Sequence, residues 1–253
     1  MNSFIRFLYG IFSYTLLAAT SLQAADGPSQ LDTVLACSHN DGRSFRVLFI
    51  GDSITLHDFN DWTIQNLGWS HLSGMAASSR QTDYADLLIK KISNARGQPA
   101  VACYHTAGGS GSVAQRLQAL DVAIPTEPNL VVIQLGEHED PAQGAQLLHE
   151  NYKKLIDAVR VMRSRPSVIA VGPWSLAPQD NAGRYSGWIG IVDRTMLAVA
   201  VQERVPYASV SDIARIQAAH GTGLSEGVRW HPNDQGQSLY AERLFKLYEQ
   251  LAP

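Results

Sequence analysis

The sequence predicts an α/β fold, a three-layer α/β/α sandwich around a mainly parallel, five-stranded sheet. Short apolar runs rich in β-branched residues recur along the chain, and they lack the polar–apolar alternation of a half-exposed strand. Helical patterns separate these runs, so that strand and helix alternate at least five times. The length of 253 residues, 45% of them hydrophobic, suits one large domain, which we expect over residues 45–253.

Each element of this sandwich has a local signal. The predicted strands cover residues 45–50, 100–104, 130–135, 168–171 and 207–210. Four predicted helices follow a side chain that can accept hydrogen bonds from the free N–H groups of a first helical turn. These side chains are Thr82, Ser112, Asp140 and Asn233. A fifth helix is predicted over residues 185–203.

The N-terminus predicts export. Arg6 supplies positive charge, residues 8–19 form a short apolar core, and Leu22-Gln23-Ala24 offers a small-residue cleavage site. We therefore expect a signal peptide over residues 1–24, an N-terminal arm over residues 25–44, and a secreted or periplasmic protein with no stable membrane insertion after cleavage. The alternative is an uncleaved anchor helix, although the apolar run is short for a bilayer span.

Charge, cysteine spacing and glycine spacing argue against nucleic acid, a metal ion and a nucleotide cofactor as ligands. A net charge of −3 and a pI of about 6.2 provide no basic field, so we do not expect nucleic acid as a partner. Cys37 and Cys103 are the only cysteines, and they either form a disulfide, which export would permit, or remain two unpaired thiols. Neither cysteine has a metal-ligand spacing, and the glycines of residues 106–112 do not match the dinucleotide fingerprint. We expect neither a metal nor a cofactor.

Polar motifs follow three of the predicted strands and precede the last helix. They are Gly51-Asp52-Ser53-Ile54, the glycine-rich segment 106–112, Gly136-Glu137-His138-Glu139 and His231-Pro232-Asn233-Asp234. Ligand sites of parallel sheets lie at the carboxyl ends of the strands, so we expect the motifs to converge on one edge. Each motif also has a purely structural alternative, because Ser53 can cap a helix, the glycines can form a flexible turn and His231 can belong to a capping segment.

Together these motifs resemble the SGNH, or GDSL-type, hydrolase superfamily, over about residues 46–245. The resemblance implies a flavodoxin-like SGNH hydrolase fold and an esterase that works through an acyl-enzyme. It assigns Ser53 as the nucleophile and His231 as its general base. The implied oxyanion donors are the Ser53 N–H, the Gly111 N–H and a side chain of the third motif.

Two positions depart from the family pattern. His138 stands where the family has asparagine, and a neutral imidazole can donate one N–H to the oxyanion. Val228 stands where the family has the acid that orients the histidine. Glu226 takes that role if Arg229-Trp230 is a two-residue insertion; otherwise a backbone carbonyl holds the imidazole in a Ser-His dyad.

The substrate is suggested by the connection over residues 55–81, which carries Trp62 and Trp69. Long connections are often functional, and exposed tryptophans can stack on sugar rings; the alternative is a self-packed loop whose tryptophans fill a satellite core. We expect an exported serine esterase that acts on small acyl esters, acetyl above all, of a carbohydrate. Rival functions are a degenerate domain that binds glycans without cleaving them and an O-acyltransferase acting on polysaccharide. With an unperturbed histidine base, activity would fall as the pH drops through about 6.5.

Overall fold

The computed structural model describes residues 43–106 and 110–251. The predicted signal peptide, most of the predicted arm and Cys37 lie outside the described residues. Cys103 is disulfide-bonded, which favours the disulfide over two unpaired thiols, while the pairing with Cys37 stays a prediction.

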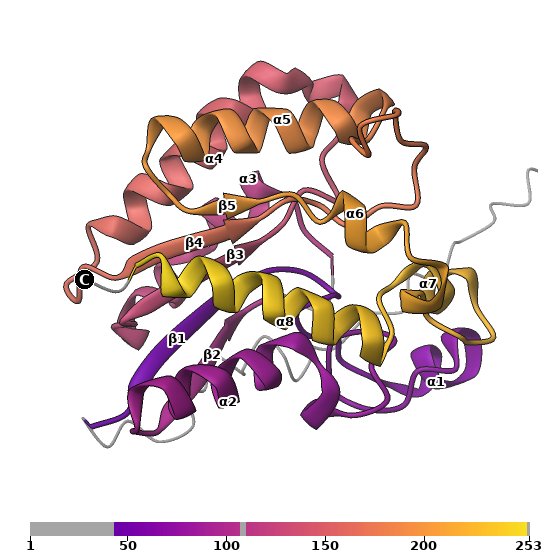
Figure 1. Cartoon of the computed structure of the whole chain (residues 1–253), viewed down its shortest axis with the longest axis horizontal. Coiled ribbons are helices and arrows are strands. Elements are labelled where there is room, and N and C mark those ends of the chain that lie inside the picture. Colours follow the sequence, from indigo (N-terminus) through magenta and orange to yellow (C-terminus); the bar gives the residue numbers. More distant parts are fainter. Residues whose placement is uncertain (1–42, 107–109, 252–253) are drawn as a thin grey trace, which may run out of the picture.

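Five parallel strands form the central sheet in the order β2-β1-β3-β4-β5, as Figure 1 shows. The strands are β1 (Phe45–Ile50), β2 (Ala100–His105), β3 (Leu130–Gln134), β4 (Ser167–Val171) and β5 (Tyr207–Ala208). All five predicted strands are confirmed, and the sheet is parallel throughout. This strand order is the flavodoxin-like one, in which the chain switches direction across the sheet between β1 and β3.

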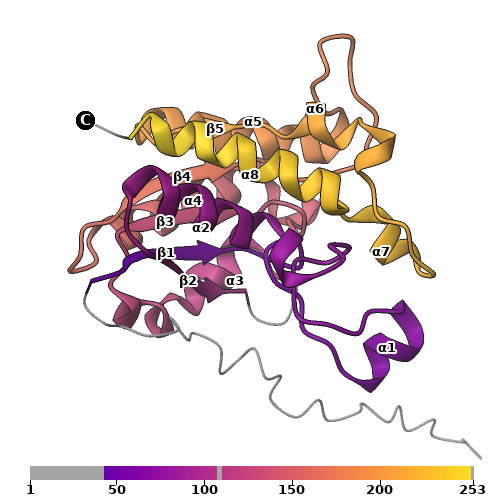
Figure 2. The same ribbon diagram turned by 60° about the horizontal axis from the view of Figure 1, so that its bottom comes forward.

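Helices cover both faces of the sheet (Figures 1 and 2). One face carries α2 (Tyr84–Arg96) and α8 (Asp234–Glu249); the other carries α3 (Val113–Gln118), α4 (Gly144–Arg160) and α5 (Gly187–Gln202). Alternate residues of each strand enter the two cores; in β1, for example, Val47 and Phe49 face one core while Leu48 and Ile50 face the other. Burial on both faces explains why the strands read as unbroken apolar runs.

Shorter elements complete the chain. They are the helices α1 (Asp61–Leu67), α6 (Ser211–Ala214) and α7 (Glu226–Trp230), and the 3-10 turns η2 (Arg80–Thr82), η4 (Leu120–Val122), η5 (Ile124–Thr126), η6 (Pro141–Gln143) and η7 (Gln217–Ala219). None of the described helices combines the length and the apolar character needed to cross a bilayer.

The predicted helix caps are largely confirmed. The Ser112 side chain accepts from the N–H of Gln115 at the start of α3, and Asn233 caps α8. The cap of α2 is Asp83 rather than Thr82, one residue later than predicted, because Thr82 ends a 3-10 turn. Asp140 caps a 3-10 turn that leads into α4.

Candidate active site

Ser53 and His231, which lie 178 residues apart in sequence, meet at the carboxyl edge of the sheet. The Oγ atom of Ser53 lies 2.7 Å from Nε2 of His231. The turn that presents the serine requires Gly51, since a Cβ atom there would overlap the hydroxyl group of Thr55. Both side chains are nearly enclosed, with Ser53 5% and His231 7% exposed.

A backbone carbonyl holds the imidazole of His231. Its Nδ1 lies 2.6 Å from the carbonyl oxygen of Gly227. Because a carbonyl only accepts hydrogen bonds, Nδ1 carries the proton and Nε2 is left to accept the proton of Ser53. Burial lowers the pKa of His231 from 6.5 to about 4, so the ring is neutral at neutral pH and suited to act as a base.

The end of α7 explains why this carbonyl is available. In a continuing helix the carbonyl of Gly227 would accept from the N–H of His231. That N–H instead donates to the carbonyl of Val228, which leaves the Gly227 carbonyl free for the imidazole. Glu226 is exposed at the first residue of the same helix. The structure therefore does not bring Glu226 to His231 as the orienting acid, and the alternative, a carbonyl-held dyad, describes the geometry.

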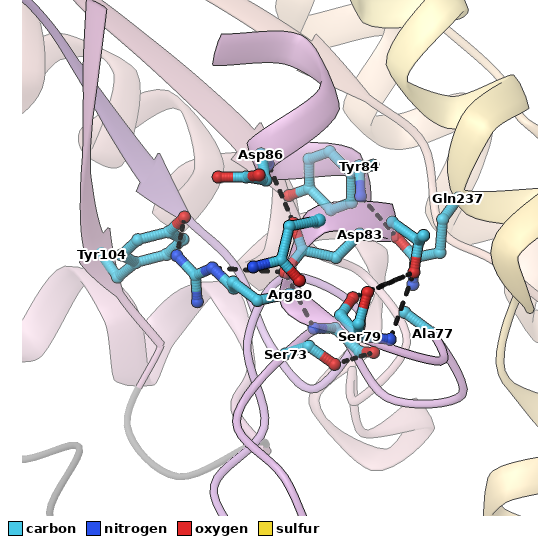
Figure 3. Close-up of polar contacts among 12 residues, drawn as sticks. Ser73, Ala77, Ser79, Arg80, Asp83, Tyr84, Asp86, Tyr104 and Gln237 are labelled. Atoms are coloured by element: carbon cyan, nitrogen blue, oxygen red, sulfur yellow. Dashed lines mark hydrogen bonds and ion pairs between the residues drawn. The ribbon is translucent and has the colours of Figure 1, made fainter. Parts of the chain in front are cut away.

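The side chain of Gln237, buried on α8, links the serine and histidine segments. It accepts from the N–H of Tyr84, as Figure 3 shows, and donates to the carbonyl oxygens of Pro232 at 3.3 Å and Met75 at 3.5 Å. The N–H of Met75 in turn donates to the carbonyl of Ser53 at 2.8 Å. One amide thus fixes the spacing between the segments that carry the two reacting side chains.

Two backbone N–H groups of the site are available as donors. Among the described residues, neither the N–H of Ser53 nor that of Gly111 has a hydrogen-bond partner. Free N–H groups of this kind can stabilise a developing oxyanion. They are the two backbone donors that the resemblance to the SGNH superfamily implies.

A buried arginine fixes the position of Gly111. Arg116 is 2% exposed, and it donates to the carbonyl oxygens of Gly51, Thr106 and Ser110 at 2.8, 2.5 and 2.5 Å. A Cβ atom on Gly111 would overlap its guanidinium group. The arginine therefore ties the glycine-rich segment to the turn before Ser53.

Comparison with known proteins identifies the family to which this arrangement of serine, histidine and backbone donors belongs. The model of the GDSL-like Lipase/Acylhydrolase family matches residues 49–239. The chain belongs to the GDSL-like lipase/acylhydrolase family. This GDSL-like protein is thus a carboxylic ester hydrolase by family, while a search of curated proteins gave no match.

Several solved structures share the fold of this GDSL-like hydrolase. The acetylxylan esterase Axe2 from Geobacillus stearothermophilus, solved as a catalytic mutant, has a TM-score of 0.58 and 14% identity over 81% of this chain and 94% of its own. TesA has a TM-score of 0.55 and 22% identity over 82% and 99%. A two-domain esterase active on acetylated mannans, CEX, has a TM-score of 0.54 and 18% identity over 87% of this chain and 52% of its own. At these identities the likeness shows the fold.

His138 lies at the site of this GDSL-like hydrolase, on the turn after β3. Its side chain is 41% exposed, and its Nε2 lies 3.9 Å from Oδ2 of Asp52. His138 and His57 are also near enough to His231 to lower the pKa of that residue beyond the effect of burial. His138 therefore lies close to the reacting side chains. Its role as the third oxyanion donor stays a prediction.

The two predicted substrate-binding tryptophans have different surroundings. Trp62 on α1 is 60% exposed. Trp69 is 3% exposed and packs with Met75 and Val228, with its ring 4.1 Å from that of His71. The prediction that Trp69 binds substrate is therefore wrong, since the ring fills the satellite core that was the alternative.

Sequence reasoning missed Arg116 and Gln237. Helix phase carried a signal for both, because Arg116 lies three residues after the core residue Val113, and Gln237 lies three residues before the core residue Tyr240. A polar residue in the apolar phase of a helix predicts a buried hydrogen-bond group.

Proposed function

We propose that the protein is an exported serine esterase that removes small acyl groups, acetyl above all, from carbohydrate. The observation that carries the mechanism is the 2.7 Å contact between Ser53 Oγ and His231 Nε2. The family supplies the reaction class, and the fold-level neighbours named above include esterases of acetylated xylan and acetylated mannans.

The proposed reaction uses an acyl-enzyme. His231 Nε2 takes the proton of Ser53 while Oγ attacks the acyl carbon, and the oxyanion receives the N–H groups of Ser53 and Gly111, with His138 as a third donor. The protonated imidazole then gives its proton to the departing sugar oxygen, leaving an ester on the serine. Water attacks this ester with His231 again as base, which releases the acid and restores the serine.

An exposed apolar rim supports a large, flat substrate. Phe59, Trp62 and Leu224 are 42%, 60% and 88% exposed. Leu224 lies against Gly68, the C-cap of α1, so the helix that bears Trp62 adjoins the segment leading into α7. Aromatic side chains bury large areas against flat ligands, which fits a sugar chain passing the serine.

Acetate release from acetylated xylan and acetylated mannan tests the proposal. Hydrolysis of 4-nitrophenyl acetate, a simple ester without a sugar, is measured in parallel for comparison. Ser53→Ala should lower turnover of both kinds of substrate by at least about 10³-fold while its circular dichroism and melting temperature match the wild type. Trp62→Ala should raise KM for the polysaccharides and leave the simple ester unchanged. Release from the simple ester alone would contradict the carbohydrate assignment.

The rival functions give different readouts. A glycan-binding domain without activity would bind xylan but would not be labelled at Ser53 by a fluorophosphonate. An acyltransferase would move the acetyl group to an added oligosaccharide in preference to water, which mass spectrometry detects. Export is tested separately, by fractionating cells that express the full chain and sequencing the N-terminus of the product.

A further inference from the structure

Two buried carboxyl groups lie behind the nucleophile, and the mechanism above uses neither. Asp52 is fully buried, and its Oδ1 accepts from the N–H of Ile54 at 3.0 Å. Glu137 Oε1 accepts from Gln134 Nε2 at 2.8 Å and from the N–H of Trp174 at 2.7 Å. The second oxygens, Asp52 Oδ2 and Glu137 Oε2, are buried, and neither receives an N–H or O–H group of the described residues.

The two side chains are neighbours, because a side-chain hydrogen bond and charge interaction between them shift the pKa of Glu137 and Asp52. Two ionised carboxylates have no proton to place between them, and they would repel each other strongly in a buried site. A buried acceptor without a donor also destabilises the fold. One proton between the two groups removes both problems.

We propose that Asp52 and Glu137 share one proton at neutral pH, with Glu137 as the donor, and that this bond positions the turn carrying His138 against the turn carrying Ser53. Glu137 and Asp52 are thus positioning residues, since neither is assigned a contact with the substrate. A second bond joins the end of β3 to the serine turn, because the side chain of Gln134 accepts from the hydroxyl group of Thr55 at 2.9 Å.

The surrounding charges decide which group keeps the proton. Burial raises the pKa of Asp52, but hydrogen bonds from Glu137 and the N–H of Ile54 and the nearby charges of His138 and Arg116 act against that rise and favour its ionised form. Burial and the negative charge of Asp52 raise the pKa of Glu137 well above its ordinary value. The remaining titratable groups that act on the pair are uncharged at neutral pH, because burial lowers the pKa of the histidine and raises those of the tyrosines. They are His57, Tyr84, Tyr185, Tyr207 and Tyr240.

Sharing a proton has a consequence for the proposed reaction. The pair carries one negative charge instead of two next to Ser53 in the chain, so it would repel an oxyanion that forms at this serine less strongly. Asp52, the member that stays ionised, has its Oδ2 atom 3.9 Å from Nε2 of His138, so its charge can support the donor role of that residue.

Infrared difference spectroscopy of the full chain tests the shared proton without using activity. The wild type at pH 7 should show the carbonyl stretch of a protonated carboxylic acid that is missing from Glu137→Gln and retained in the surface control Glu249→Gln. A wild-type spectrum identical to that of Glu137→Gln in this region would overturn the proposal, whether or not the protein is an esterase.

Kinetics test the positioning role, and this part rests on the proposed function. The amide of Glu137→Gln can donate an N–H to Asp52, so kcat should stay within about threefold of the wild type, whereas Glu137→Ala should lower kcat about tenfold or more with little change in KM. If Glu137→Gln loses as much as Glu137→Ala, Glu137 needs its negative charge and the proposal is wrong. If Glu137→Ala does not fold, the comparison of Glu137→Gln with Glu249→Gln still decides.

Discussion

The serine turn (residues 51–55) and the histidine segment (residues 227–233) meet at one hydrogen bond, yet different kinds of interaction hold them. Buried ionisable groups fix the serine turn, with Arg116 bound to the Gly51 carbonyl and Asp52 enclosed behind the serine. Neutral groups fix the histidine segment, namely the Gly227 carbonyl and the Gln237 amide. Removing one partner of a buried charge costs more than removing one neutral hydrogen bond. We therefore expect the serine turn to be the more fragile of the two.

The largest effect should come from Arg116→Met, which keeps an unbranched, flexible side chain but removes the guanidinium group with its charge and donors. Three carbonyl oxygens lose their donor and Asp52 loses a nearby cation, so the free energy of unfolding should fall by about 3 kcal/mol or more. Urea denaturation measures this loss. Arg116→Lys restores the charge without the forked geometry and should fall between the two. A loss below about 1 kcal/mol would mean that charge does not hold the turn.

The pH dependence should follow the histidine segment. Burial lowers the pKa of His231 to about 4, so kcat/KM should stay level from pH 7 to about 5 and fall tenfold per unit once His231 is protonated. This replaces the limb at about 6.5 that an unperturbed histidine would give. Because the folded pKa lies below the unfolded one, the unfolded state binds the proton first, and stability falls as the pH drops from 6.5 to about 4. A limb near 6.5 in the measured profile would contradict the enclosed, carbonyl-held ring.

A smaller effect is expected for Gln237→Ala. The variant removes one amide that serves both segments, which should lower the free energy of unfolding by about 1–3 kcal/mol and reduce kcat through looser spacing of Ser53 and His231. Its matched control is Gln235→Ala, which alters an exposed residue two positions earlier on the same helix. Equal losses in the two variants would show that Gln237 has no special part in the link.

The smallest effect should be that of Glu226→Ala. An exposed residue without a role in orienting the base should leave kcat/KM within about twofold and stability within about 0.5 kcal/mol. A fall of about 10⁴-fold, the scale of losing an orienting acid, would instead assign a triad.

Much of this arrangement was predictable from sequence because parallel sheets bring the carboxyl ends of their strands together. The apolar runs gave the strands, and the polar motifs after them placed Ser53, Gly111, His138 and His231 at one edge. The group that accepts from Nδ1 of His231 was not predictable, since the availability of the Gly227 carbonyl depends on the residue at which α7 ends. Trp62 and Trp69 also read alike in sequence, and only packing against Met75 and Val228 distinguishes them.

The link through Gln237 also bears on when this protein becomes an enzyme during its synthesis. The serine turn is made early, but its base and the amide that spaces it belong to the last stretch of chain, just before and within α8. A nascent chain can build all five strands and still be catalytically silent until its final helix docks. The time at which ester hydrolysis first appears would therefore report the time at which folding of the chain is complete.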